Sequence, residues 1–265
     1  MFLVSGASGG IGRALAIEAA ARGARVALMA RNADKLAAVV EQITARGQSA
    51  LAVPGDVRSD EDVGRVVATV TERFGAVDVL VNNAGKGFTG TVIETALEDY
   101  RDIFETNFMG CLRLTQAVLP SMIERRSGLL IQISSLNGFC AIPLASAYCA
   151  SKFAMEALSD SLRIELRPDG IGVLVVQPGL TDTEFFDNAR HFRERNPFPL
   201  QRMMSPETVA KKTLAAAAAG RRTLTLTADG KALWWMKKLS PRLVDLILAR
   251  FVGKALAAAA RRAGN

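Results

Sequence analysis

The feature that most constrains this chain is a glycine-rich turn between a short apolar segment and a helical one. Residues 2–4 predict a strand, and residues 13–22 predict an alanine-rich helix. Between them Gly6, Gly10 and Gly12 follow the spacing Gly-x-x-x-Gly-x-Gly. Glycine lets the backbone approach a phosphate closely, and the N–H groups that open a helix attract negative charge. With a strand before it and a helix after it, the turn predicts a nucleotide-binding α/β unit rather than a turn without a ligand.

Strand-like and helical segments alternate along the rest of the chain. The strand-like segments lie at residues 25–30, 49–53, 77–81, 129–133 and 172–176. The helical segments lie at about 33–46, 60–74, 96–125 and 147–167. This alternation implies right-handed crossovers and a parallel sheet that helices cover on both faces. Ligands bind beyond the carboxyl ends of the strands in such a sheet, so we expect the functional site there.

Tyr148 and Lys152 stand four residues apart at the start of a predicted helix. Positions i and i+4 share a helix face, so the phenol and the ammonium point into the same pocket. A neighbouring cation favours the phenolate, and we expect the tyrosine pKa to fall from about 10 toward about 7. Such a group exchanges protons at cellular pH. Taken alone, such a pair is more often a surface tyrosine followed by a solvated lysine, so the other motifs decide. Cys149 points elsewhere on the helix and is interpreted as a packing residue.

Together with the glycine spacing, this pair resembles the short-chain dehydrogenase/reductase family over about residues 2–230. Further motifs follow in the family's order. They are Asp56-Val57 after the third strand, Asn82-Asn83-Ala84-Gly85 after the fourth, Asn107 within a helix, Ser135 thirteen positions before Tyr148, and Pro178-Gly179 followed by Thr183. The resemblance implies one catalytic domain, 1–230, with a Rossmann-type doubly wound parallel α/β sheet of about seven strands. The last strand would lie at 223–227.

The resemblance also implies roles for single residues in a nicotinamide-dependent hydride transfer. Tyr148 would donate a proton to a carbonyl oxygen, and Ser135 would hydrogen-bond the same oxygen. Lys152 would hold ribose hydroxyls and lower the tyrosine pKa, and Asn107 would anchor a water in a proton relay. The implied cofactor-binding residues are Gly6, Ser8, Gly10, Ile11, Gly12, Arg31, Asp56, Val57, Asn83, Ala84, Gly85, Tyr148, Lys152, Pro178, Gly179, Thr181 and Thr183. No metal site is expected.

Two positions depart from the family pattern. Ser5 stands where threonine is commoner, and Thr181 stands where valine or isoleucine is usual. The backbone of Thr181 can still contact a carboxamide, so we expect little effect from that change.

The end of the second strand predicts which dinucleotide binds. An acid at this point would bind the ribose 2′-hydroxyl of NAD and repel a 2′-phosphate. This chain has Arg31 instead, whose guanidinium offers a cationic fork to a phosphate. Asp34 lies nearby, but in the place of an ordinary first-turn helix acid. The sequence therefore favours NADP over NAD.

The substrate is expected to be an apolar carbonyl compound or alcohol, because the residues assigned to its pocket are apolar. They are Phe88, Leu136, Phe139, Leu144, Leu180, Phe185 and Phe186. In the family, an insertion corresponding to residues 180–205 forms a lid over the substrate. His191, the one histidine of the chain, is interpreted as a solvated lid residue and not as a catalytic group.

The positive charge of the chain is concentrated in its last 35 residues. The formal net charge is +7, and residues 231–265 hold eight lysines and arginines against Asp245 alone. Residues 1–230 are therefore formally neutral, which argues against a nucleic-acid-binding body. Three irregularly spaced cysteines, and the absence of a signal peptide, predict a reduced, cytoplasmic protein.

Residues 231–265 predict a basic amphipathic helical tail beyond the catalytic domain. Ser240-Pro241 is a helix start, and Trp234-Trp235 stands beside two lysines. Such a tail suits either peripheral contact with anionic lipid or packing on the body or a second subunit, as in a homodimer or homotetramer. Besides a carbonyl reductase, the chain could therefore be a membrane-surface lipid oxidoreductase. A dinucleotide-sensing protein without turnover is a third hypothesis, which the complete catalytic set disfavours.

Overall fold

The computed structural model describes residues 1–185 and 203–263 of the chain. At its centre lies a seven-stranded, fully parallel sheet in the order β3-β2-β1-β4-β5-β6-β7. The strands are β1 (Phe2–Ser5), β2 (Val26–Met29), β3 (Ala50–Ala52), β4 (Val79–Asn82), β5 (Gly128–Ile133), β6 (Ile171–Gln177) and β7 (Thr223–Thr225). The predicted doubly wound sheet of about seven strands is confirmed.

Each face of the sheet carries its own hydrophobic core, because neighbouring residues of a strand point to opposite faces. Leu3 contributes to one core and Val4 to the other, and both are fully buried. The first core packs under α3 (Asp60–Phe74), α5 (Gly110–Glu124) and α6 (Ser146–Glu165), and the second under α1 (Gly10–Ala21), α2 (Ala33–Thr44) and α8 (Pro206–Ala218). Parallel strands covered on both sides are what the alternating sequence requires.

The helix expected at 96–125 is interrupted in its middle. It consists of α4 (Leu97–Phe104), a π-helical turn η1 (Glu105–Met109) and α5. Single π-turns inside helices occur frequently at functional sites. Asn107 lies within this turn and is fully buried, so the interruption aims its amide into the protein interior.

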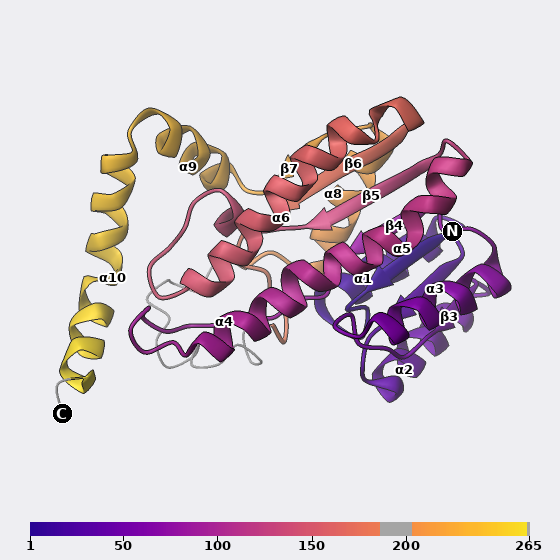
Figure 1. The fold of residues 1–265 in the computed structure, drawn as a ribbon, viewed down its shortest axis with the longest axis horizontal. Coiled ribbons are helices and arrows are strands. Elements are labelled where there is room, and N and C mark those ends of the chain that lie inside the picture. The colour runs from indigo at the N-terminus through magenta and orange to yellow at the C-terminus, as the bar shows by residue number, and fades with distance from the viewer. Residues whose placement is uncertain (186–202, 264–265) are drawn as a thin grey trace.

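The carboxyl-terminal region forms two helices, and the second begins at the expected start, Ser240-Pro241. α9 (Ala228–Leu239) carries both tryptophans, and α10 (Pro241–Ala263) begins after the break at Ser240. α9 thus starts before residue 231 and crosses the expected domain boundary. In Figure 1 the two helices lie at one end of the molecule and the amino terminus at the other. Within 1–185 and 203–263, no helix combines the length and hydropathy needed to cross a bilayer.

Candidate active site

A cavity of about 1380 Å³ opens at the carboxyl ends of the strands, where the sequence places the site. It is lined from the loops that follow β1, β2, β3, β4, β5 and β6. All the residues proposed above for catalysis and cofactor binding line it, except Gly12 and Asn107. Gly12 and Asn107 lie behind the lining residues and contact them.

The glycine turn has a conformation that other residues could not adopt without strain. Gly6 has φ +64°, and a Cβ there would lie 2.9 Å from the backbone of Ala84. A Cβ on Gly12 would lie 2.4 Å from the carbonyl oxygen of Gly6. Both glycines are therefore required so that β1, α1 and the loop after β4 can approach one another.

Ser5 joins the first and fourth strands at the floor of the cavity. Its buried hydroxyl accepts hydrogen bonds from the backbone N–H of Asn83, at 3.0 Å, and of Ala84, at 3.1 Å, and donates one to the carbonyl of Val81. The Asn83 amide donates back to the carbonyl oxygens of Ser5 and Gly6. Serine at this position therefore loses no hydrogen bond relative to threonine, because the hydroxyl group, which both residues have, makes all of these bonds.

The start of α1 is suited to an anion. Gly9 occupies the N-cap without a side-chain cap, and the first turn contains no acid. The first N–H groups of a helix have no intrahelical acceptor, and they point out of its amino-terminal end. A Cβ on Gly9 would meet nothing within 4 Å, so the backbone here is open to a ligand in the cavity. These are the properties that a bound pyrophosphate requires.

Cations gather on the cavity wall at the end of β2. Arg31 is exposed there, and Lys35 on the first turn of α2 also lines the cavity. Lys35 forms an ion pair with Glu184 at 2.6 Å, which connects α2 to the loop after β6. Asp34 lies in the first turn of α2, as expected, and is not among the lining residues. Sequence reasoning missed Lys35 because a lysine within a helix carries no motif.

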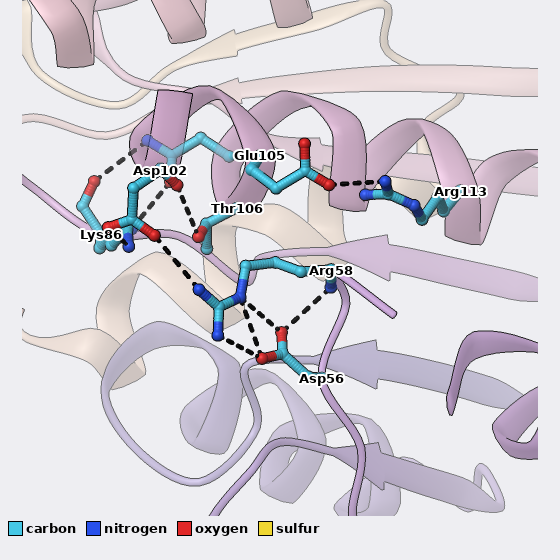
Figure 2. Close-up of polar contacts among 8 residues, drawn as sticks. Asp56, Arg58, Lys86, Asp102, Glu105, Thr106 and Arg113 are labelled. Carbon is cyan, nitrogen blue, oxygen red and sulfur yellow. Dashed lines mark hydrogen bonds and ion pairs between the residues drawn. The ribbon is translucent and has the colours of Figure 1, made fainter. Parts of the chain in front are cut away.

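Asp56 belongs to a chain of ion pairs, shown in Figure 2, of which Arg58 and Lys86 also line the cavity. Arg58 binds both of its carboxylate oxygens and also reaches Asp102 on α4 at 3.2 Å. Lys86, in the loop after β4, pairs with the same Asp102. Partial burial would raise the pKa of Asp56, but hydrogen bonds from Arg58 and the charges of Arg58 and Arg31 hold it below its usual value. The network thus fixes an anionic Asp56 at the cavity edge.

Val57, which follows Asp56 in the expected cofactor-binding motif, also supports the structure behind the cavity. It is 6% exposed, and it packs so closely on Gly110 of α5 that a Cβ there would lie 2.6 Å away. Arg113 on α5 anchors the same region through Asp60 and Glu105. Arg58, Lys86 and Arg113 were not identified from the sequence, because no motif marks them.

Tyr148, Ser135 and Lys152 meet at the inner end of the cavity. All three side chains line the cavity, and Lys152 Nζ lies 5.9 Å from the centroid of the tyrosine ring. Lys152 also donates to the carbonyl oxygen of Ile133, at 2.8 Å, at the end of β5. The i, i+4 spacing on α6 therefore brings the phenol and the ammonium into one pocket, as expected.

The expected fall of the tyrosine pKa is wrong for this structure. Burial raises the pKa of Tyr148 to about 12, and the hydrogen bond with Ser135 opposes this only in part. Burial also lowers the pKa of Lys152 to about 8. Desolvation disfavours the charged form of each group, and this effect exceeds the attraction that sequence reasoning considered. At pH 7 the site therefore holds a neutral phenol, which can donate a proton, beside a largely cationic lysine.

Asn107 holds the loop after β4 and helix α6 together. Its amide oxygen accepts from the N–H of Lys86 at 2.8 Å, and its amide nitrogen donates to the carbonyl of Lys86 and to Ser151 Oγ, both at 3.0 Å. Ser151 in turn donates to the carbonyl of Tyr148 at 2.7 Å. The amide thus acts on the catalytic helix through Ser151, and its expected role in anchoring a water stays a prediction.

The apolar part of the cavity differs from the expected set of residues. Leu136, Leu180 and Phe185 line it, and Phe185 packs edge-on against the Tyr148 ring at 5.7 Å. Phe88, Phe139 and Leu144 do not line it. Phe88 instead forms a small core with Ile103 and Ala147, because its loop turns inward over α4 and α6. Phe186 and His191 lie outside the described residues, as does most of the expected lid.

Two lining residues come from the tail. Leu233 of α9 and Leu248 of α10 both face the cavity. Sequence reasoning missed them because it treated residues 231–265 as an appendage. The glycine at position 230 is the residue that could have indicated this close packing, because a Cβ there would lie 2.6 Å from Leu136. This contact places the start of α9 against the cavity wall.

The cysteines serve packing. Cys111, Cys140 and Cys149 are all buried and unpaired. Burial raises the pKa of Cys149 to about 11, so it is a thiol and not a nucleophile at neutral pH.

Comparison with known proteins agrees with this geometry. Residues 1–194 match the short chain dehydrogenase family. The uncharacterized oxidoreductase YxnA of Bacillus subtilis (strain 168) is 32% identical over 256 residues, 95% of this chain and 72% of that protein. An actinorhodin polyketide ketoreductase variant with NADPH has a TM-score of 0.75 and 33% identity, over 84% of this chain and 94% of its own. A short chain dehydrogenase/reductase from Burkholderia phymatum with NAD has a TM-score of 0.84 and 25% identity, over 91% and 94%.

Proposed function

Since the chain belongs to the short-chain dehydrogenase/reductase family of oxidoreductases, we propose that it reduces the carbonyl group of an apolar small molecule with NADPH. The reverse oxidation of the alcohol would use the same residues. One observation carries the proposal. Ser135, Tyr148 and Lys152 line the inner end of a cavity, and the uncapped amino-terminal end of α1 lies at its other side.

The described residues fit a nicotinamide dinucleotide. The turn from Gly6 to Gly12 and the uncapped start of α1 would hold the pyrophosphate, and Lys152 would hold a ribose. Arg31 supports NADP over NAD, because the end of β2 presents a cation where an acid would select NAD. Lys35 adds a second cation to the same wall. When bound, the nicotinamide supplies the hydride.

The protein's own part in the reaction is to position the substrate oxygen and to supply its proton. Tyr148 would give its proton to that oxygen, because a phenol with a pKa near 12 is protonated at pH 7. Ser135, which lines the cavity together with the tyrosine, would hold the same oxygen. The cationic Lys152 would stabilise the phenolate that remains.

The apolar lining supports an apolar substrate. Leu136, Leu180 and Phe185 meet Leu233 and Leu248 of the tail around the catalytic tyrosine. A substrate with an extended hydrocarbon part would bury apolar surface against all of them, at about 25 cal/mol per Å².

One experiment separates an enzyme from a protein that only senses the dinucleotide. Oxidation of NADPH would be followed with a panel of aliphatic, aryl and polycyclic ketones and aldehydes, with NADH in parallel and the Tyr148→Phe variant as control. The proposal expects turnover with apolar carbonyls, preference for NADPH, and loss of turnover in the variant. Tight NADPH binding without turnover of any substrate would support the sensing hypothesis, and preference for NADH would overturn the cofactor assignment.

A further inference from the structure

The two tail helices each have a face that turns toward the protein and a face that turns away from it. On α10 the buried residues Val244 and Val252, and the cavity-lining Leu248, recur every fourth position. On α9 the buried Gly230 and the cavity-lining Leu233 mark the inner side. Since successive residues turn by about 100°, the outer side of each helix follows from these positions.

The outer sides carry large apolar side chains in contact with water. On α9, Trp235 is 59% exposed and Leu239 is 78% exposed. On α10, Leu243 is 46% and Leu246 70% exposed. Monomeric soluble proteins rarely leave such residues grouped on one element unless the surface binds something.

The charged residues of the outer sides are all cations. By the same helical geometry, Lys231 and Lys238 flank Trp235 on α9, and Arg242 and Arg250 flank the leucines on α10. Lys238 Nζ lies 3.8 Å from the centroid of the Trp234 ring.

The two acids of these helices lie off their outer sides, although the side chain of Asp245 is 68% exposed. Asp229 lines the cavity, and Asp245 pairs with Lys237 at 3.5 Å. The outer surface of 228–250 therefore combines exposed leucine and tryptophan with positive charge and, within that range, no acid.

We propose that this outer surface, defined as Lys231, Trp235, Lys238, Leu239, Arg242, Leu243, Leu246 and Arg250, docks on an anionic lipid bilayer. Tryptophan and leucine enter the boundary between headgroups and acyl chains, while lysine and arginine extend to the phosphates. Each cation adds about 1 kcal/mol of attraction to an anionic surface. A second copy of the chain fits less well, because two such surfaces would bring like charges together.

Docking in this way also gives the cavity an apolar entrance. The helices that would rest on the bilayer are the ones whose other sides, through Leu233 and Leu248, line the cavity. A lipophilic substrate could then enter the cavity without crossing water. The docking itself does not rest on the proposed reaction, because it concerns a surface outside the catalytic residues.

Co-sedimentation of the full-length protein with vesicles tests the proposal without any turnover. The vesicles would be phosphatidylcholine alone and phosphatidylcholine with one third phosphatidylserine. We expect binding to the anionic vesicles only, weakened by salt.

Arg242→Gln/Arg250→Gln should weaken binding about 30-fold, since two cations are lost. Leu243→Ser/Leu246→Ser should also weaken it, and at all salt concentrations. The matched control is Lys211→Gln/Lys212→Gln, which removes two exposed cations on α8 and should bind as wild type.

The outcomes are distinct. All the substituted side chains are exposed, so each variant should keep the wild-type melting temperature, which is measured in parallel. An equal loss of vesicle binding in Lys211→Gln/Lys212→Gln would show that binding depends on net charge alone, and it would overturn the proposal. Absence of binding to anionic vesicles would overturn it as well. If, in addition, Leu243→Ser/Leu246→Ser changed the mass measured by light scattering, the surface would be a contact between subunits instead.

Discussion

The two ends of the cavity are built in different ways. At the end proposed for the dinucleotide, Ser5, Asn83 and Asn107 use backbone and side-chain hydrogen bonds to fix loops from different strands. At the end proposed for the substrate, Phe185, Leu233 and Leu248 line the wall through apolar surface, and two of the three belong to the tail. Hydrogen bonds demand particular atoms at particular distances, whereas apolar contact accepts many side chains. The first end therefore fixes the chemistry, and the second is free to set the substrate.

The largest effect is expected where the two ends meet. Tyr148→Phe removes the proton donor but keeps the ring that packs on Phe185, so kcat should fall about 10² to 10⁴-fold. NADPH affinity, measured by fluorescence titration, should stay within a few-fold. The control is Tyr100→Phe, which removes the hydroxyl that is hydrogen-bonded to Ser146 at 2.6 Å and should retain most activity. A Tyr148→Phe enzyme with near wild-type kcat would show that another group supplies the proton.

A substitution confined to the dinucleotide end should change cofactor choice and nothing else. Arg31→Asp exchanges the phosphate-binding cation for a repelling charge, and the ratio of kcat/KM for NADPH to that for NADH should fall about 10²-fold. The KM for the carbonyl substrate should not change. Arg73→Asp, on an exposed residue of α3 away from the cavity, makes the same charge change and should leave the ratio alone. If wild type already prefers NADH, the Arg31 argument fails.

The pH dependence tests the lysine at the inner end. Lys152 is cationic below its pKa of about 8 and loses its charge above it. Carbonyl reduction, followed as kcat from pH 6 to 10, should be level below pH 8 and then fall about tenfold per pH unit. In Lys152→Arg the charge persists to high pH, so the fall near pH 8 should disappear even where the rate is lower. A wild-type kcat that stays constant up to pH 10 would show that the charge of Lys152 does not contribute to the rate.

The smallest effect is expected from the tail residues that line the substrate end. Leu233→Ala or Leu248→Ala removes apolar surface worth about 1 kcal/mol, so KM for a bulky apolar carbonyl should rise about fivefold. The KM for NADPH should not move, because neither side chain lies at the dinucleotide end. Leu246→Ala changes an exposed residue of the same helix and serves as control. Equal shifts in both KM values would mean that the tail supports the whole cavity rather than the substrate part.

The same contrast explains what could be predicted from the sequence. The parallel sheet and the tight glycine turn after β1 were predictable, because alternating segments and glycines that adopt a positive φ leave fixed spacings in the sequence. The helix start at Ser240-Pro241 was predictable as well, but the lining by Leu233 and Leu248 was not, because apolar positions on a helix do not show what they face. Phe88 was misplaced for the same reason. The tyrosine pKa was misjudged because spacing shows a neighbouring charge but not the depth of burial.

Because of the π-turn η1, the position of Asn107 depends on the number of residues between α4 and α5 as well as on their identity. A π-turn closes its hydrogen bonds over one residue more than an α-turn does. Deleting a single residue from Glu105–Met109 would let α4 and α5 join as one regular α-helix with little change in their relative orientation, because the π-turn holds one extra residue in nearly the same turn. The hydrophobic contacts of α5 with the sheet could survive this change, whereas the Asn107 amide would lose Lys86 and Ser151. An in-frame loss of one codon would therefore disable the active site while leaving a folded protein, a change that substitution scanning would never sample.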